Sequence, residues 1–221
     1  MGRKSHQPPA SGEATVNLSL EQLDALQEIV NIGIGQAASI LNQMIDSPIR
    51  LQIPYLKVVS PEILEHELEV KINGNFISAV GLKFAGSFAG TAQMVFPTDS
   101  AALLVTMLTG EEIGSNDLDA VKIGTLSEVG NIVINGVMGA ISNVLQQHLD
   151  YSLPNYTEGT IQTLLKSSDL ATKTVILFAQ ASFTIEKLKI EGDIILIFNV
   201  NSFDTLLGAI NKIAGSNLLS I

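Results

Sequence analysis

Two long stretches of the chain carry apolar residues at the spacing of an α-helix. The first begins at Ser19, which forms a capping-box pattern with Gln22, and it ends near Ile45, before Asp46-Ser47-Pro48. A second stretch of this kind runs from about Asp117 to Leu149. The apolar positions of the first stretch are Leu23, Leu26, Val30, Ile34, Ala37, Leu41 and Met44. These patterns predict two long amphipathic helices.

Shorter segments of β-branched and aromatic residues predict strands after each long helix. Residues 76–85 and 90–96 are separated by Gly86-Ser87-Phe88-Ala89, which predicts a hairpin, and residues 172–185 and 188–200 predict a second one. The remaining strand segments are 49–55 and 56–59, and short helices are predicted from Asp99 or Ser100 to Gly110 and from Ser202 to Gly215. Adjacent hairpins favour an antiparallel sheet.

The order of these elements repeats along the chain. Glu28–Ile32 reads Glu-Ile-Val-Asn-Ile, and Glu128–Ile132 reads Glu-Val-Gly-Asn-Ile, 100 residues later; Pro54 and Pro154 have the same offset. We therefore expect one domain over residues 18–221, built from halves near 18–110 and 116–215, after a flexible polar tail at 1–17. The predicted fold class is α/β: a two-layer, pseudo-two-fold duplicated αβ repeat with a mainly antiparallel shared sheet and two long helices.

Composition narrows the range of functions. The 221 residues are 46% hydrophobic and carry a net charge of −10, which argues against binding nucleic acid. The absence of cysteine excludes disulfides and thiolate chemistry, and His6, His66 and His148 lack the spacing of metal ligands. No apolar run approaches the ~20 residues of a membrane helix, and the N-terminus lacks a signal-peptide core. We expect a soluble cytoplasmic protein with no metal site of its own.

A polar stripe on the long helices contains the candidate functional residues. At ~100° per residue, Asp24, Glu28 and Asn31 fall within about 60° of one another, away from the apolar face. Gly35 continues the stripe without a side chain, so another surface can approach closely there. The simplest interpretation is a solvated helix face. Recurrence of the pair as Glu128 and Asn131 favours a function, because asparagine is a mediocre helix former; a duplication, however, also copies neutral residues.

Here the sequence resembles the CheC/CheX/FliY family of phosphatases. The motif is Asp24-x-x-x-Glu28-x-x-Asn31 with Pro54 after 22 intervening residues, and its second copy, Glu128-x-x-Asn131 with Pro154, is similar to CheC in particular. The resemblance implies hydrolysis of the aspartyl phosphate of a CheY-like response regulator. It implies that Glu28 and Glu128 pair with a lysine of the regulator and that Asn31 and Asn131 position the attacking water.

The resemblance also implies partners and roles around this pair. Asp24 supports docking, and Mg²⁺ is supplied by the bound regulator, so the chain needs no cofactor of its own. A CheD-like protein is a possible further partner. The second copy departs from the motif, because Gly124 stands where the first copy has Asp24, and Asn135 replaces the equivalent of Gly35 and adds a polar group to the face. The first copy is therefore the stronger candidate site.

Three alternatives were weighed against this function. The first is a non-catalytic adaptor that binds the regulator or a CheD-like protein with the same helix face. The second is a flagellar switch component of the FliY type, which we do not expect, because those carry an additional C-terminal domain. The third is a dinucleotide site, since Gly33–Ala38 matches G-x-G-x-x-A, but that fingerprint must follow a strand and open a helix. Here it lies inside a predicted helix, so the glycines are better explained by close packing.

Overall fold

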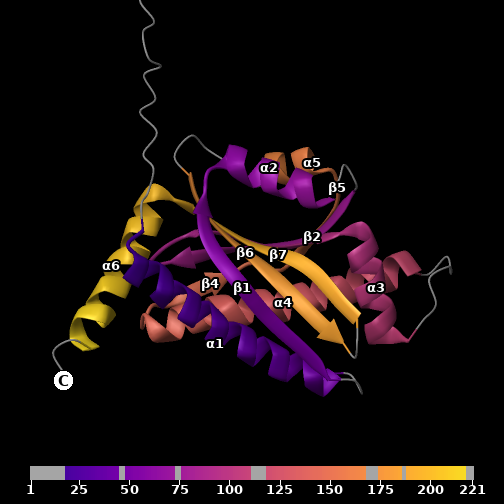
Figure 1. Cartoon of the computed structure of the whole chain (residues 1–221), viewed down its shortest axis with the longest axis horizontal. Coiled ribbons are helices and arrows are strands. Elements are labelled where there is room, and N and C mark those ends of the chain that lie inside the picture. Colours follow the sequence, from indigo (N-terminus) through magenta and orange to yellow (C-terminus); the bar gives the residue numbers. More distant parts are fainter. Residues whose placement is uncertain are drawn as a thin grey trace, which may run out of the picture.

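The computed structural model describes residues 18–44, 48–72, 76–110, 118–167, 174–185 and 188–217. Within them, six helices and seven strands form one mixed α/β unit (Figure 1). The helices are α1 (Leu20–Met44), α2 (Pro61–Ile72), α3 (Thr98–Thr109), α4 (Leu118–Val144), α5 (Ile161–Ser167) and α6 (Val200–Asn217). The strands are β1 (Ile49–Val59), β2 (Ile77–Gly86), β3 (Gly90–Pro97), β4 (Leu149–Tyr151), β5 (Asn155–Gly159), β6 (Thr174–Ile185) and β7 (Leu188–Asn199).

All seven strands belong to one antiparallel sheet, which both halves of the chain share. The strand order is β1-β6-β7-β3-β2-β4, and β5 also pairs with β2. The hairpins β2–β3 and β6–β7 lie at the centre. Each half contributes its first strands to the hairpin of the other half, since β1 pairs with β6, and β4 and β5 pair with β2. This interleaved arrangement confirms the predicted fold class.

The N-terminus of α1 begins at the capping box that the sequence predicts. The Oγ of Ser19 accepts a 3.1 Å hydrogen bond from the backbone N–H of Gln22, and Oε1 of Gln22 accepts one of 2.9 Å from the N–H of Ser19. Two backbone donors that the helix cannot satisfy are thus paired. The cap fixes the start of α1, and therefore the face on which its later residues lie.

The long helices α1 and α4 cross at two glycines. A Cβ atom added to Gly33 would lie 2.4 Å from the carbonyl oxygen of Gly136, and one added to Gly136 would lie 2.6 Å from that of Gly33. No side chain larger than hydrogen fits at either position without moving the helices apart. The prediction that glycines of the G-x-G-x-x-A match serve close packing is confirmed for Gly33.

Helices cover both faces of the sheet. The sequence predicted helices for one face, among them α1 and α4, but did not predict α2 and α5 on the other. Buried residues of α1, α3, α4 and α6 form the main hydrophobic core with one face. The short helices α2 and α5 cover part of the other face through Leu64, Leu68, Ile72, Ile161 and Leu164. Figure 1 shows these two helices together on one side of the sheet. None of the described helices covers the rest of this second face, which carries Ser182 and Lys189 next to the site.

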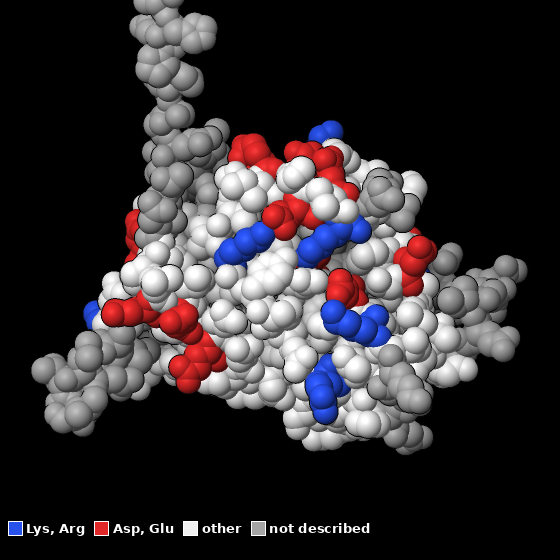
Figure 2. Space-filling model, viewed as in Figure 1, with Lys and Arg blue, Asp and Glu red and all other residues white. Residues whose placement is uncertain are grey.

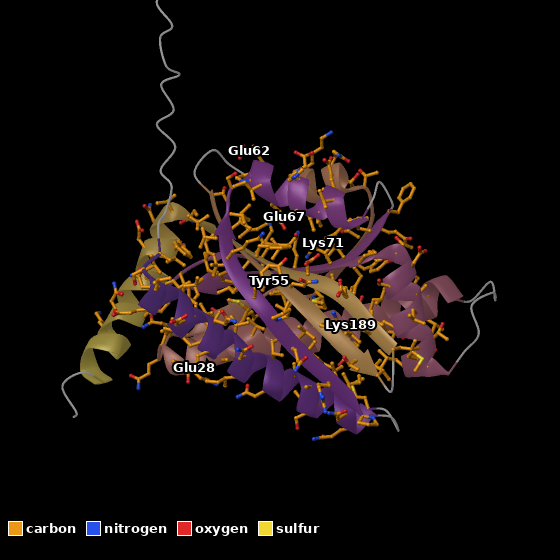
Figure 3. The ribbon with its side chains drawn as sticks, viewed as in Figure 1. Glu28, Tyr55, Glu62, Glu67, Lys71 and Lys189 are labelled. Atoms are coloured by element: carbon orange, nitrogen blue, oxygen red, sulfur yellow. The ribbon has the colours of Figure 1, made fainter. Side chains whose placement is uncertain are left out.

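A half-buried lysine attaches α2 to the sheet. Nζ of Lys71 lies 2.7 Å from Oδ1 of the buried Asp193 on β7, and 4.9 Å from the ring centroid of Phe178. Burial alone lowers the pKa of Lys71, but its hydrogen bond and charge interaction with Asp193 outweigh burial and raise that pKa. Burial raises the pKa of Asp193, and Lys71 offsets only part of that increase. Figure 3 shows Lys71, Tyr55 and Glu67 gathered beneath α2.

Some element ends differ from the sequence-based prediction for local reasons. α3 begins at Thr98 after Pro97, without a side-chain cap from Asp99 or Ser100. α4 ends at Val144 because Gln146 adopts a left-handed conformation with φ 52°. α6 begins at Val200, because Oδ1 of Asn199 accepts a 2.8 Å hydrogen bond from the N–H of Ser202. The predicted strand segments 49–55 and 56–59 form a single strand, β1, with a bulge at Pro54.

The predicted tail at 1–17, the junction at 111–117 and the end of the chain from 218 lie outside the described residues. None of the helices in the described ranges combines the length and apolarity that crossing a bilayer requires.

Candidate functional site

The middle of α1 presents the predicted acid–amide pair to the surface. Asp24, Glu28 and Asn31 are all exposed, while Leu26 and Val30 between them are buried. Together with Gln27 and Ile32, the three polar residues line a shallow depression. The structure thus brings together the three residues that the sequence placed on one helix face, and Figure 3 shows Glu28 on the outer side of α1.

The surface around this depression is acidic with an apolar neighbour. In Figure 2, Asp and Glu atoms gather over α1 and no Lys or Arg atoms lie among them. Ile32, one residue after Asn31, is 44% exposed. A single exposed isoleucine is common on protein surfaces, so Ile32 adds an apolar group to the depression but does not by itself mark a contact site. Sequence reasoning missed Ile32, because its exposure depends on tertiary packing.

A second depression adjoins the first at Asn31. Its lining includes Gly35 from α1, Pro54 from β1, Ser182 from β6 and Lys189 from β7. A Cβ atom at Gly35 would have no neighbour within 4 Å, so a partner's backbone can approach here, as the sequence suggested. Lys189 and Ser182 lie more than 150 residues after Asn31 in the chain, and the pairing of β1 with β6, and of β6 with β7, brings them to the site.

The second copy of the pair is in a different environment. Glu128 is exposed on α4, but Asn131 is half-buried, and its Oδ1 accepts a 2.8 Å hydrogen bond from the side-chain amide of Asn135. Ile132, the counterpart of the exposed Ile32, is only 7% exposed. Gly124 provides no side chain at the position equivalent to Asp24. Asn31 is exposed, and Gly35 leaves the position one turn beyond it without a side chain. Asn131 is half-buried, and its oxygen is occupied by the amide of Asn135.

Within the described residues, no three His, Cys, Asp or Glu side chains come together in a group suited to a metal ion. The exposed face of α1 offers a carboxylate and an amide held one helical turn apart. A carboxylate binds a cation, and an amide both donates and accepts hydrogen bonds.

The fold is similar to that of FliY and of the FliM middle domain. FliY from Thermotoga maritima superposes with a TM-score of 0.71 over 88% of this chain and 98% of its own, at 16% identity. The FliM middle domain from H. pylori gives a TM-score of 0.58 over 87% of this chain and 99% of its own, at 14% identity. At these identities the likeness concerns the architecture.

The sequence comparisons show similarity to the same family. A model of the CheC-like family matches residues 21–50, the segment that contains Asp24, Glu28 and Asn31. The CheY-P phosphatase CheC of Bacillus subtilis (strain 168) is 26% identical over 142 residues, which are 61% of this chain and 65% of that relative's length. These findings confirm the resemblance to the CheC/CheX/FliY family.

Proposed function

We propose that the chain is a phosphatase that hydrolyses the aspartyl phosphate of a CheY-like response regulator. The observation that carries the proposal is the open acid–amide pair of Glu28 and Asn31, which lies in the segment matched by the CheC-like family model. The relative from Bacillus subtilis, named as a CheY-P phosphatase, supports the same substrate class.

Glu28 is the docking residue of this mechanism. Its carboxylate is exposed on an acidic helix face, next to the carboxylate of Asp24. A lysine in the regulator's active site pairs with Glu28 through a charge-assisted hydrogen bond. Asp24, one turn earlier, adds to the negative potential that attracts this lysine. The pairing orients α1 across the mouth of the regulator's phosphorylation site.

Asn31 is the catalytic residue of this mechanism. One turn beyond Glu28, its amide accepts a hydrogen bond from a water molecule and donates one to the phosphoryl group, so a lone pair of the water points at phosphorus. The water oxygen forms a bond to phosphorus, and the bond between phosphorus and the aspartyl oxygen breaks. The products are inorganic phosphate, which keeps the water's oxygen, and the free carboxylate, and the released proton goes to phosphate or solvent. Such transfers depend mainly on in-line positioning and charge neutralisation.

The remaining participants belong to the partner and to the cell. Mg²⁺ is held by the regulator's own acidic residues and neutralises the phosphoryl charge, and the proposed location is the cytoplasm, where both proteins meet. A CheD-like protein is a further proposed partner. Glu128 and Asn131 form a second, weaker site, because the Asn131 amide is already engaged by Asn135 and Ile132 is covered.

Phosphate release from a phosphorylated regulator tests the proposal. CheY of Bacillus subtilis, phosphorylated with acetyl phosphate and freed of the donor, is mixed with catalytic amounts of the chain, and inorganic phosphate is followed with time. We expect release well above the regulator's own rate. If the chain binds phosphorylated CheY without accelerating release, the adaptor function replaces the phosphatase. Full activity of a variant with both Asn31→Ala and Asn131→Ala would contradict the assigned chemistry.

A further inference from the structure

We propose that the groove between Asn31 and Lys189 is a second docking site, which takes an acidic segment of the same regulator and fixes its orientation on α1. This inference rests on the proposed function and adds to it a specificity-determining residue, Lys189. The regulator is then held at two points of opposite charge, and the water-positioning amide lies between them.

The groove continues directly from the acid–amide pair. Asn31 lines both depressions, so they meet at this residue, with Asp24 and Glu28 on one side and Lys189 on the other. Its walls come from α1 and from β1, and Pro54 and Gly35 present little side-chain bulk along it. Proline has no N–H to offer, and the bulge at Pro54 interrupts the regular edge of β1. The edge therefore offers space for a side chain rather than a strand to pair with.

Lys189 is held in place at the far end of the groove. Its Nζ lies 2.7 Å from Oε1 of Glu191, and the other carboxylate oxygen of Glu191 accepts a 3.2 Å hydrogen bond from the side-chain amide of Gln180. The hydrogen bond from Lys189 is the main cause that lowers the pKa of Glu191. Lys189 remains 61% exposed, so its ammonium retains donors for an incoming carboxylate.

A second cation stands in the same row of the sheet. Thr184 is in register with both Lys189 on β7 and Arg50 on β1, so the three side chains project from the same face. Arg50 is exposed. This end of the surface carries the cations of Arg50 and Lys189 and the carboxylate of Glu191, whereas the end on α1 carries exposed Glu21, Asp24 and Glu28. In Figure 2, acidic atoms lie over α1, and the basic side chains beyond β1 lie among acidic ones.

Opposite charges at the two ends select one orientation of a partner. A regulator that offers a lysine to Glu28 and a carboxylate to Lys189 is attracted at both ends, and the same regulator turned by half a circle is repelled at both. This arrangement explains why a strongly acidic chain keeps a cation on the surface next to its catalytic helix. A carboxylate-bearing segment of the regulator is the occupant that these charges fit.

Charge reversal provides the kinetic test. Lys189→Glu is compared with Lys83→Glu, a matched control, because Lys83 is an exposed lysine on β2 that projects from the same sheet face far from the groove. With phosphorylated CheY as the probe, we expect Lys189→Glu to lower kcat/KM about threefold to tenfold at low salt, with kcat unchanged, and the loss to shrink at high salt. Equal behaviour of the two variants would overturn the proposal.

Site-specific labelling separates this inference from the proposed function. The chain contains no cysteine, so Gln52→Cys, in the lining of the groove, and Lys83→Cys each carry one thiol for a fluorescent label. Both are prepared in the Asn31→Ala background, which removes the catalytic amide but leaves Glu28 and Lys189 in place. We expect added phosphorylated CheY to change the emission of the label at 52 and not at 83.

The outcomes of the two tests differ for the two hypotheses. A response at 52 together with no accelerated phosphate release in the unmodified chain contradicts the phosphatase and keeps the docking site. Accelerated release with no response at 52 keeps the phosphatase and overturns the docking site. A response that appears on raising the concentration of the chain alone, without CheY, assigns the groove to a second copy and also overturns it.

Discussion

The side-chain amide of Asn135 donates a 2.8 Å hydrogen bond to the Oδ1 atom of Asn131. The two residues are one turn apart on α4, and together they occupy the positions that Asn31 and Gly35 hold on α1. One turn after Asn31, Gly35 leaves the helix surface without a side chain, whereas one turn after Asn131 the amide of Asn135 occupies that space and competes for the Asn131 oxygen. One substitution between the two copies thus changes both the space above the amide and the availability of its oxygen.

The two asparagines are expected to contribute unequally to phosphate release. Asn31→Ala removes the open amide, and we expect release from phosphorylated CheY to fall about tenfold or more, as for other residues that position a reacting group. Asn131→Ala removes an amide that is already engaged, so its loss should be smaller than about twofold. The comparison is made under single-turnover conditions. Equal losses would contradict the asymmetry of the two sites.

Removal of the competing donor should improve the second site. In an Asn31→Ala background, Asn135→Gly frees Oδ1 of Asn131 and restores the open position found at Gly35. We expect phosphate release to recover severalfold over Asn31→Ala alone. Asn143→Gly, an exposed asparagine near the end of the same helix, controls for the effect of a new glycine on α4. If both substitutions act alike, the hydrogen bond to Asn131 has no influence on catalysis.

The crossing of α1 and α4 is expected to tolerate no side chain at Gly33. Gly33→Ala places a methyl group 2.4 Å from the carbonyl oxygen of Gly136 and 2.6 Å from Cα of Val137, so the helices must separate. We expect the free energy of unfolding to fall by about 2–3 kcal/mol, measured by urea denaturation. Gly139→Ala meets no atom within 4 Å and should instead add up to about 1 kcal/mol, because alanine favours the helix.

The ion pair beneath α2 should give a pH-dependent phenotype when it is broken. Lys71→Met leaves Asp193 buried without its cation, which we expect to cost roughly 2–4 kcal/mol near neutral pH. Burial already raises the pKa of Asp193, and the loss of Lys71 raises that pKa further. The folded variant then binds a proton more readily than the unfolded chain does. Between the pKa of Asp193 in the unfolded chain and its raised pKa in the folded variant, the stability of the variant falls as pH rises and recovers as pH falls.

The measurement is urea denaturation of wild type and Lys71→Met between pH 4 and 8. The difference in unfolding free energy between them should shrink toward acid pH. Adding Asp193→Asn to Lys71→Met should abolish that trend, because the titrating group is gone. Lys57→Met serves as the control, since the Lys57–Glu67 pair has side chains 35% and 30% exposed and should contribute less than about 1 kcal/mol. A constant difference across the pH range would contradict the role of Asp193.

Local sequence signals predicted the helix that carries the site. The capping box of Ser19 and Gln22 fixes where α1 begins, and helical periodicity then determines the direction of Asp24, Glu28 and Asn31. The shared sheet followed from the repeat, because a half with so few strands cannot cover its own helix. These features depend on residues close together in the sequence or on the internal repeat, so they could be predicted from the sequence alone.

Features that depend on strand pairing or on competition between side chains were missed. The helix α2 is only twelve residues long and rich in glutamate, and its buried face has just Leu64, Leu68 and Ile72. Ile32 and Ile132 are equivalent isoleucines in the two copies. One is exposed and the other is buried, because different elements pack around each helix. Lys189 reaches the groove only because β1 crosses from one half of the chain to pair with β6 of the other.

The exchange of first strands between the halves has a consequence for how such a protein diversifies. Since each half completes the other's sheet, neither copy can be discarded, even if its surface no longer performs any chemistry. Substitutions on the outer face of α4 that leave its buried face intact can therefore alter the second surface without disturbing the shared sheet. The Asn131–Asn135 hydrogen bond lies on that outer face, apart from the buried contacts that join the two halves.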